Sequence, residues 1–366
     1  MELKIERKEL LSALTVGGSL AGRSKVLPIL DNVKLRVKGN NLQVVSMDGQ
    51  SAIQKRVALL NCDVDGEFAV CASDLLKAVK ALKDPIVSLV YSKEKKTLVI
   101  EHLKGNISLS AITTEDFPVV VHGENGESVT LGSETFFAWL NAAKSFVATD
   151  GVRPVMSGMY IEINDNSVTV CASDGMKLFT DSIEINSIAN VNAIIPSGVL
   201  NAMQSVINGT SACQVTIDTT HTTVSVADAK IITRNIDGRY PNFRMVIPAD
   251  QKIMVGLNKQ EFSDALSRVS ICSDSASLIK MNIIGENAII EANNADFGKS
   301  ASEELRCFHE DVDIAIGFKC DSMMGLIGNI AAEDVLITMS APNKAIVLKD
   351  NENPNKTLLV MPCVID

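Results

Sequence analysis

Short runs of alternating apolar and polar residues recur along the chain, separated by turn residues. Residues 30–53, "LDNVKLRVKGNNLQVVSMDGQSAI", contain two such runs joined by a polar turn, and an Asp-Gly turn follows the second run. This pattern predicts a β-hairpin. It returns in residues 156–179 and, less closely, in residues 277–300, so that Asp174 follows Asp48 by 126 positions. The chain therefore contains an internal repeat, which indicates a repeated architecture.

Segments with helical spacing flank each of these hairpins. Before each hairpin a short strand leads into apolar residues three and four apart, as in Leu10, Leu11 and Leu14. After each hairpin a strand again leads into a helix. Polar residues stand where these second helices are expected to begin, and the sequence predicts that they act as N-caps: Ser73, Ser197 and Asp321.

The repeat predicts an α+β protein of three domains, 1–122, 123–249 and 250–366. Each domain is expected to pack two helices on an antiparallel sheet of roughly six to eight strands. The segments 122–128 and 247–252 have the composition of linkers between them.

The composition of the 366 residues is 46% apolar and only 4% aromatic, which favours cores of aliphatic side chains. No run of 18 apolar residues occurs, and the N-terminal "MELKIERKEL" is charged, so neither a membrane span nor a signal peptide is predicted. We expect a cytoplasmic protein with no membrane partner.

The eight cysteines and four histidines are scattered, without a Cys-x-x-Cys pair. Zinc sites require closely spaced ligands. The sequence therefore predicts no metal site, and no cofactor motif is present.

An acidic pair of Asp48 and Asp174 would suit glycoside hydrolysis. The repeat favours a structural interpretation, because these turns lie in different domains and the third copy carries Asn294. A hydrolase that uses Asp174 is kept as an alternative, although Ser173 has no nucleophile elbow around it. The glycines of residues 15–25 follow a helix and match no phosphate loop, so a flexible connection is expected there. We predict no catalytic residues and a protein that is not an enzyme.

The charge is unevenly distributed. The total is −10, while residues 1–122 carry +3, residues 123–249 carry −5 and residues 250–366 carry −8. Opposite charges at the two ends of a chain suit a head-to-tail contact between two copies, which closes into a ring when the rotation per subunit allows it.

Several motifs resemble the bacterial DNA polymerase III β subunit family, the sliding clamps, and they follow the family's order along the whole chain. The motifs are "VLPILDNVKLRV" (26–37), "TTEDFP" (113–118), "GVRPVMSGMYIEI" (151–163), "ASDGMKL" (172–178), "DGRYPNFRMVIP" (237–248) and "LLVMP" (358–362). The motifs at 237–248 and 358–362 together are highly specific for this family.

The resemblance implies a ring of two chains and six domains that encircles duplex DNA without sequence preference and tethers a polymerase for processive synthesis. Topology would retain such a ring, so tight phosphate contacts are not required. The implied partners are duplex DNA, a second copy of the chain, the DNA polymerase III α subunit, the clamp loader and other proteins with a clamp-binding motif. A repeat scaffold that binds peptides without encircling DNA is the alternative function.

Three sets of site residues are implied by the resemblance. A groove for a Gln/Leu/Phe-containing partner peptide would comprise Met156, Ser173, Gly175, Met176, Lys177, Leu178, Pro241, Met245, Val246, Asn343, Ala345, Leu359, Val360, Met361 and Pro362. The DNA-facing residues would be Arg23, Lys25, Lys77, Lys80, Lys144 and Arg153, with Lys8, Lys83, Lys259 and Arg268 as further basic residues on predicted helices. The dimer interface would comprise Lys96, Lys104, Ile107 and Leu109 on one chain and Ile271, Cys272, Glu303 and Glu304 on the other.

Some positions depart from the family pattern. Ser73, Asp74 and Ser197 stand where basic residues are usual, and Pro154 and Val155 replace aromatic residues. Met245 replaces a basic residue, and residues 363–366 replace the family's usual ending. The peptide preference of the groove is expected to differ accordingly.

Overall fold

The computed structural model describes residues 1–24, 27–118, 126–164, 166–187, 189–309 and 313–364. Its α-helices fall in three pairs, one pair in each repeat, as the sequence predicted. They are α1 (Arg7–Gly17), α2 (Ala72–Ala81), α3 (Ser133–Phe146), α4 (Leu200–Ile207), α5 (Lys259–Val269) and α6 (Cys320–Ile327). The fold class of three helix-and-sheet repeats is confirmed.

The chain forms two compact units, one of residues 1–140 with 198–236 and one of residues 141–197 with 237–366. The first unit holds a sheet of thirteen antiparallel strands. In spatial order these strands are β10 (Glu127–Gly132), β15 (Ala212–Ile217), β16 (His221–Ser225), β17 (Ala229–Arg234), β4 (Ser51–Ala58), β3 (Asn41–Met47), β2 (Asn32–Lys38), β6 (Gly66–Cys71), β9 (Gly105–Ile112), β8 (Thr97–His102), β7 (Ile86–Ser92), β1 (Glu2–Glu6) and β5 (Asn61–Cys62).

The second unit holds two sheets. The nine-stranded sheet has the order β14 (Val191–Pro196), β11 (Gly158–Asn164), β12 (Ser167–Ser173), β13 (Lys177–Glu184), β26 (Asn353–Val360), β25 (Ile346–Asp350), β24 (Asp334–Met339), β18 (Ile253–Asn258) and β22 (Phe308–His309). The four-stranded sheet has the order β21 (Lys299–Arg306), β20 (Asn287–Asn294), β19 (Leu278–Ile284) and β23 (Ile314–Lys319). β21 therefore forms one edge of its sheet.

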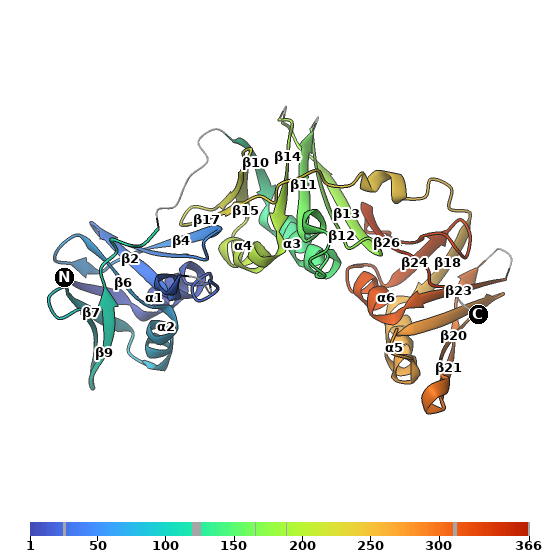
Figure 1. Cartoon of the computed structure of the whole chain (residues 1–366), viewed down its shortest axis with the longest axis horizontal. Coiled ribbons are helices and arrows are strands. Elements are labelled where there is room, and N and C mark those ends of the chain that lie inside the picture. Colours follow the sequence, from blue (N-terminus) through green and yellow to red (C-terminus); the bar gives the residue numbers. More distant parts are fainter. Residues whose placement is uncertain (25–26, 119–125, 165, 188, 310–312, 365–366) are drawn as a thin grey trace. The chain divides into compact units, whose positions relative to one another are not determined.

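The helices of the first repeat cover one face of its strands. α1 and α2 contact each other, and Leu10, Leu14 and Val79 are buried in one core with Leu35 and other strand residues. The strands supply this core through the alternation predicted from the sequence, since every second residue of β2 is buried. Each such aliphatic side chain contributes roughly 1.5–3 kcal/mol when fully buried. Figure 1 shows α1 and α2 together beside β6, with β9 nearby.

The third repeat uses the same plan. α5 and α6 contact each other (Figure 1), and Phe262, Leu266 and Met323 are buried at their faces. α5 begins at a regular cap, because the side chain of Asn258 accepts hydrogen bonds from the backbone N–H groups of Gln260 and Glu261.

The predicted N-caps of the second helices are wrong. Cys71 and Lys319, the last strand residues, occupy the N-cap positions of α2 and α6, so Ser73 and Asp321 lie inside the first turns. Ser197 begins a short 3₁₀ turn, and Val199 precedes α4. β6 and β23 run directly into α2 and α6, and neither N-cap residue makes a side-chain capping hydrogen bond.

The segment after α1 is more ordered than the flexible connection expected from its glycines. Backbone hydrogen bonds close turns that end at Gly18, Ser19 and Ala21, and the N–H of Gly22 donates to the carbonyl of Leu30. Leu20 is fully buried, and its N–H donates to the side-chain oxygen of Ser46. The glycines serve this close packing, because a side chain at Gly17 would meet the backbone oxygen of Val44.

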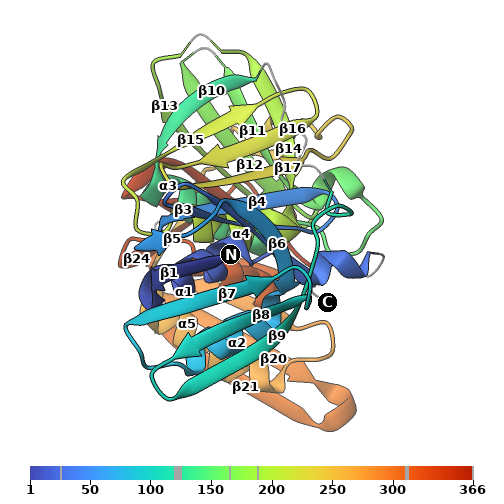
Figure 2. The same cartoon turned by 90° about the vertical axis from the view of Figure 1, so that its left-hand side faces the viewer.

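Strand β4 pairs with β17, and we call this pairing the first joint. Ala52 lies opposite Ile232, and the buried hydroxyls of Ser51 and Thr233 are 2.8 Å apart. Figure 2 shows β4 and β17 side by side. At the far end of β4 the ammonium of Lys55 lies 2.6 Å from the carboxylate of Asp228, which precedes β17.

Strand β13 pairs with β26 in the same way, and we call this pairing the second joint. Leu178 lies opposite Leu359. Just after the last residue of β13 that pairs with β26, Asn353 donates its side-chain amide to the carboxylate of Asp181, and Asn355 donates to the carbonyl of Ser182. Because β4 and β13 are equivalent strands of the repeat, as are β17 and β26, the two joints are equivalent.

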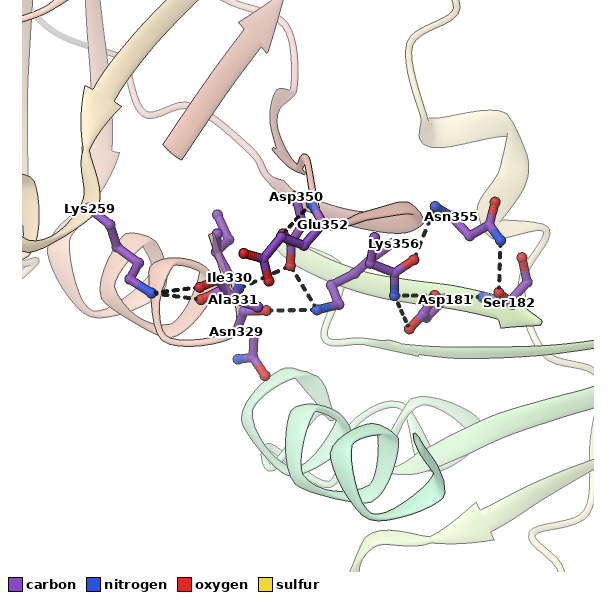
Figure 3. A network of polar contacts seen from close by, with 11 residues as sticks. Asp181, Ser182, Lys259, Asn329, Ile330, Ala331, Asp350, Glu352, Asn355 and Lys356 are labelled. Carbon is purple, nitrogen blue, oxygen red and sulfur yellow. Dashed lines mark hydrogen bonds and ion pairs between the residues drawn. The ribbon is translucent and has the colours of Figure 1, made fainter. Parts of the chain in front are cut away.

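A buried charge supports the second joint from one side, as Figure 3 shows. Lys356 donates to Asp350 at 3.0 Å and to the carbonyl of Asn329 at 3.2 Å, and Asp350 also accepts from the N–H of Ala331. Lys259 donates to the neighbouring carbonyls of Ile330 and Ala331. Burial raises the pKa of Asp350, but the hydrogen bonds and the Lys356 ammonium outweigh it, so this pKa lies below its ordinary value.

No helix in the described part of the chain is long and apolar enough to cross a membrane.

Candidate functional site

The turn between β12 and β13 is stabilised by hydrogen bonds between its own side chains and backbone. One carboxylate oxygen of Asp174 accepts the N–H groups of Met176 and Lys177, each at 2.8 Å. The Ser173 hydroxyl donates to the carbonyl of Lys177 and accepts the N–H of Gly175, whose φ is +86°. Such side-chain to backbone bonds are typical of an Asx turn.

The equivalent turn between β3 and β4 is built in the same way. Asp48 accepts the N–H groups of Gln50 and Ser51, and Gly49 has a φ of +97°. The third copy differs: Asn294 donates to the carbonyl of Ser273, and a 3₁₀ turn from Ala295 to Phe297 follows it. Asp48 and Asp174 thus serve as turn residues, in agreement with the structural interpretation.

The turn after β12 lies against the C-terminal strand. The N–H of Met361 donates to the carbonyl of Met176 at 2.8 Å, which extends the pairing of β13 with β26. Met176 and Met361 are 47% and 37% exposed, whereas the neighbouring Leu178, Leu359 and Val360 are buried. The pair of strands therefore presents exposed methionine side chains next to buried aliphatic residues.

The predicted groove residues divide by burial. Those at the surface are Gly175, Met176, Pro241, Met245, Val246, Asn343 and Met361; Lys177 and Pro362 are half-buried; Met156, Ser173, Leu178, Ala345, Leu359 and Val360 are buried. Met245 is 81% exposed and Val246 52%. The structure brings the Ser173–Leu178 turn together with Leu359–Met361.

Arg153 and Phe146 contact this turn, and the sequence did not indicate either contact. The guanidinium of Arg153 lies directly over Gly175, where a Cβ atom would collide with it. The ammonium of Lys177 lies 5.8 Å from the centre of the Phe146 ring, which closes the other side of the turn. Arg153 also pairs with Asp150 at 3.0 Å, and its hydrogen bond holds the pKa of that carboxyl below its usual value.

A small cavity adjoins the end of β26. It is lined by Ala315, Gly317, Pro342, Asn343, Pro362, Cys363 and Val364. The N–H of Cys363 donates to the carbonyl of Gly317, which fixes the C-terminal segment along one wall. Only Asn343 and Pro362 of this cavity were predicted, because the others carry no motif that could identify them.

The segment that contains Pro241 and Met245 is anchored on β11. Arg244 pairs with Glu162 at 2.6 Å, and the rings of Tyr160 and Tyr240 stack with centroids 4.9 Å apart. Burial and the nearby Glu162 raise the pKa of Tyr160 to about 12. These contacts position the exposed Met245 and Val246 at the end of a 3₁₀ turn, Phe243–Val246.

The predicted DNA-facing residues have different surroundings. Lys77 and Lys80 are exposed on α2, and Arg23 is exposed and donates to the carbonyl of Gly198. Lys144 on α3 is half-buried, and burial lowers its pKa. Arg153 contacts the Gly175 turn, as described above, and Lys25 lies outside the described residues.

The predicted interface residues lie on β9, β21 and the turns next to them. Ile107 and Leu109 lie on β9, with Lys96 and Lys104 in the turns on either side of β8. Glu303 and Glu304 lie on β21, which contacts the 3₁₀ turn that holds Ile271 and Cys272. Ile271 is 73% exposed. Arg268 donates to Glu303, and this hydrogen bond raises the pKa of the guanidinium.

Among the described residues, no three His, Cys, Asp or Glu side chains are close enough to hold a metal ion. The burial of Cys171 raises the pKa of its thiol to about 12.

Three family models match successive parts of the chain. They are the N-terminal, central and C-terminal domains of the DNA polymerase III beta subunit, matched by residues 1–121, 130–242 and 244–364. Among curated proteins, the beta sliding clamps of Pseudomonas aeruginosa and Escherichia coli are each 25% identical to the chain, over 367 and 366 residues and 99% of both sequences.

Solved sliding clamps share the fold over the full length. A Pseudomonas aeruginosa clamp bound to griselimycin superposes with a TM-score of 0.95 at 22% identity, covering all of both chains. A Caulobacter crescentus clamp, with polyethylene glycol bound to a putative tethering region, superposes with a TM-score of 0.93 at 22% identity, covering 100% of this chain and 99% of that one.

The repeats, their joints and these similarities define the class, which is that of the three-domain sliding clamps. The chain belongs to the DNA polymerase III beta subunit family.

Proposed function

We propose that two copies of this chain close into a ring around duplex DNA, and that the ring tethers a DNA polymerase for processive synthesis. In this role the chain is a non-catalytic sliding clamp, acting in the cytoplasm where the chromosome is copied. The main support for this proposal is the strand joint that occurs twice within the chain. The two strands that could form a third joint of the same kind do not pair with each other within the described chain.

The open halves are β9 and β21. Among the described residues, β21 pairs only with β20, and residues 105–110 of β9 pair only with β8. β21 is the third-repeat equivalent of β4 and β13, and β9 is the first-repeat equivalent of β17 and β26. Exposed strand edges are templates for pairing with another chain. A joint between β21 of one chain and β9 of another would satisfy both edges and close the ring.

The two existing joints predict the register of the third. In the repeated hairpins, the seventh pairs counted from the open ends are Met47–Ala52, Ser173–Leu178 and Asn293–Ser300. In the last strands, the equivalent residues are Ser108, Ile232 and Leu359, which pair with Val99, Thr223 and Val347. Ala52 lies opposite Ile232, and Leu178 lies opposite Leu359. Ser300 should therefore lie opposite Ser108 of the partner subunit.

This register also accounts for the charges. Glu303 occupies the position of Lys55, and Lys104 occupies the position of Asp228. The ion pair of the first joint would thus recur with its signs reversed, between Glu303 and Lys104 of the partner subunit. Ile107 and Leu109 would enter the joint with Ala301 and Lys299 opposite them, which combines an apolar centre with a complementary rim.

For partner binding, we propose the predicted groove around Met176, Leu178, Met245 and Met361, with a Gln/Leu/Phe-containing peptide as its occupant. Support comes from the exposed methionines beside buried aliphatic residues of β13 and β26, since methionine adapts to varied apolar side chains. The polymerase α subunit and the clamp loader would bring such peptides.

A matched pair of variants tests the groove. Burial of one methionine side chain is worth roughly 1.5–3 kcal/mol, so Met245→Ala should weaken peptide binding by about tenfold. Met254→Ala, at a 43% exposed methionine on β18, should leave binding unchanged. Fluorescence polarisation with a labelled Gln/Leu/Phe-containing peptide measures both, and equal affinities for the two variants would exclude Met245 from the site.

Topology tests the ring. The protein, loaded by a clamp loader on a nicked circular DNA, should co-elute with the DNA and be released when a restriction enzyme makes the circle linear. Equal retention on circular and linear DNA would contradict encirclement. A repeat scaffold that binds peptides without DNA would load on neither.

A further inference from the structure

The lysines on the helices of the first repeat have no partners among the described residues. Lys8 on α1 and Lys77 and Lys80 on α2 are exposed, and none of them makes a hydrogen bond or ion pair with the described part of the chain. Lys83, just after α2, is exposed and equally unpaired. Lys77 and Lys80 are three positions apart and so share one face of α2.

The basic residues on the other helices are already engaged or partly covered. Lys259 donates to the carbonyls of Ile330 and Ala331. Arg268 donates to Glu303 through its Nε and one terminal nitrogen of its guanidinium. Lys144 is half-buried, and burial lowers its pKa. α4 and α6 contain no lysine or arginine.

The charge balance of the helices follows the same division. α1 and α2 together carry two more basic than acidic residues, α3 and α4 are balanced, and α5 and α6 carry one acidic residue more. The exposed residues of α3 and α4 include Asn141, Ser145 and Asn201, which are polar without charge.

We infer that the phosphates of encircled DNA contact the ring through α1 and α2 of each chain, and that the helices of the second and third repeats pass the duplex without a charged contact. The inference rests on the proposed function and names the surface that function uses. Phosphates gather near unneutralised cations, whereas a cation that already serves a carboxylate or carbonyl attracts them less. Contacts confined to one repeat per chain would hold the duplex weakly and allow it to slide.

Photocrosslinking from one exposed helix position in each repeat tests the surface. A benzophenone amino acid is placed singly at Ser73 on α2, Asn141 on α3 or Ser267 on α5, all exposed and none of them basic. Each variant is loaded on nicked circular DNA and irradiated. We expect at least about fivefold more DNA adduct from Ser73, because phosphates concentrate beside the unpaired lysines. Equal adduct yields from the three positions would overturn the inference.

The readouts separate this inference from the proposed function. If no variant and no unmodified protein is retained on the circle, the ring itself fails. If all are retained and the adducts are equal, only the placement of the contacts fails.

A charge-removal experiment gives a second measure. Lys77→Gln with Lys80→Gln removes two unpaired charges per chain, and Lys144→Gln with Arg268→Gln removes two covered or paired ones. Binding of each dimer to a short linear duplex is followed by fluorescence polarisation over a range of salt. Each lost phosphate contact lowers the slope of log affinity against log salt by about 0.9. The first variant should lose a slope of about 2 to 4, at two contacts in one or both chains, and the second almost none; equal losses would contradict the inference.

Discussion

Asn353 donates its side-chain amide to both carboxylate oxygens of Asp181, at 3.2 and 3.0 Å, and both residues lie at the second joint. Asp181 is 4% exposed. Asp181→Ala would leave the half-buried amide of Asn353 without its acceptor, at a cost of roughly 1–3 kcal/mol in the free energy of unfolding. Urea denaturation measures the loss.

Asn192→Ala is the control for that change, because Asn192 is exposed and its side chain makes no hydrogen bond among the described residues. It should stay within about 0.5 kcal/mol of the unchanged protein. Equal stabilities for Asp181→Ala and the unchanged protein would show that the pair contributes nothing to the joint.

The register of the ring joint can be tested by crosslinking. Directly opposed residues of an antiparallel pair have Cβ atoms about 4.5–5.5 Å apart. Ser108→Cys with Ser300→Cys should therefore crosslink two chains through a short bis-maleimide, and denaturing electrophoresis should show the dimer. Ser108→Cys with Ser302→Cys, two positions away, is the control. If the control crosslinks better, the register is wrong.

Charge reversal tests the proposed ion pair at that joint. Lys104→Glu should weaken the dimer, because it would face Glu303 of the partner subunit. Glu303→Lys should also weaken it, in part through repulsion from Arg268. The double variant should recover part of the loss, and direct pairs of this kind are worth about 0.2–1 kcal/mol when exposed. Sedimentation at several concentrations gives the dissociation constants, and no recovery would argue against this pair.

The repeat supplies a matched control for the peptide groove. Gly49 and Gly175 have the same role in equivalent turns, with φ values of +97° and +86°. Alanine at either position strains the backbone by roughly 1–3 kcal/mol. Only at Gly175 does the added Cβ also displace a neighbour, the guanidinium of Arg153, since the space around Gly49 is open.

We therefore expect Gly175→Ala to weaken peptide binding and Gly49→Ala to leave it unchanged, while both lower the melting temperature. Calorimetric titration and thermal unfolding measure the two effects. The same loss of peptide affinity in both variants would mean that the effect is one of general stability.

The buried Asp350 should make stability depend on pH. Its folded pKa lies below the ordinary value of 3.8, so its ionised form stabilises the folded protein. That contribution is complete above the unfolded pKa and is lost as the pH falls through the folded pKa. Asp350→Asn should lower stability at pH 7, and the difference between the two proteins should shrink below about pH 4. Urea denaturation at both pH values checks this, and a constant difference would contradict it.

Much of the fold could be predicted because its elements have strong periods. The alternation around Leu35 and Val44 and the helical spacing of Leu10 and Leu14 are local patterns, and each matches the observed burial. The turn at Asp174 could also be predicted from the sequence, since the hydrogen bonds of an Asx-Gly turn form within the turn itself.

Other features depend on packing between distant segments and left no local signal. The sequence predicts Ser73 as an N-cap, yet Cys71, the last residue of β6, occupies that position and the helix begins at once after it. Arg153 is predicted from the sequence as a DNA-facing residue, but its position over Gly175 depends on the packing of two loops. The pairing of Asp181 with Asn353 joins residues far apart in the chain.

The equivalence of the two joints has a consequence for how such assemblies are divided among polypeptides. If the hairpin strand of one repeat always pairs with the last strand of another in the same register, the contact is the same whether the two repeats belong to one chain or to two. The position of the chain ends would then determine only which joint can open, and a tandem fusion of two copies should still form a complete ring.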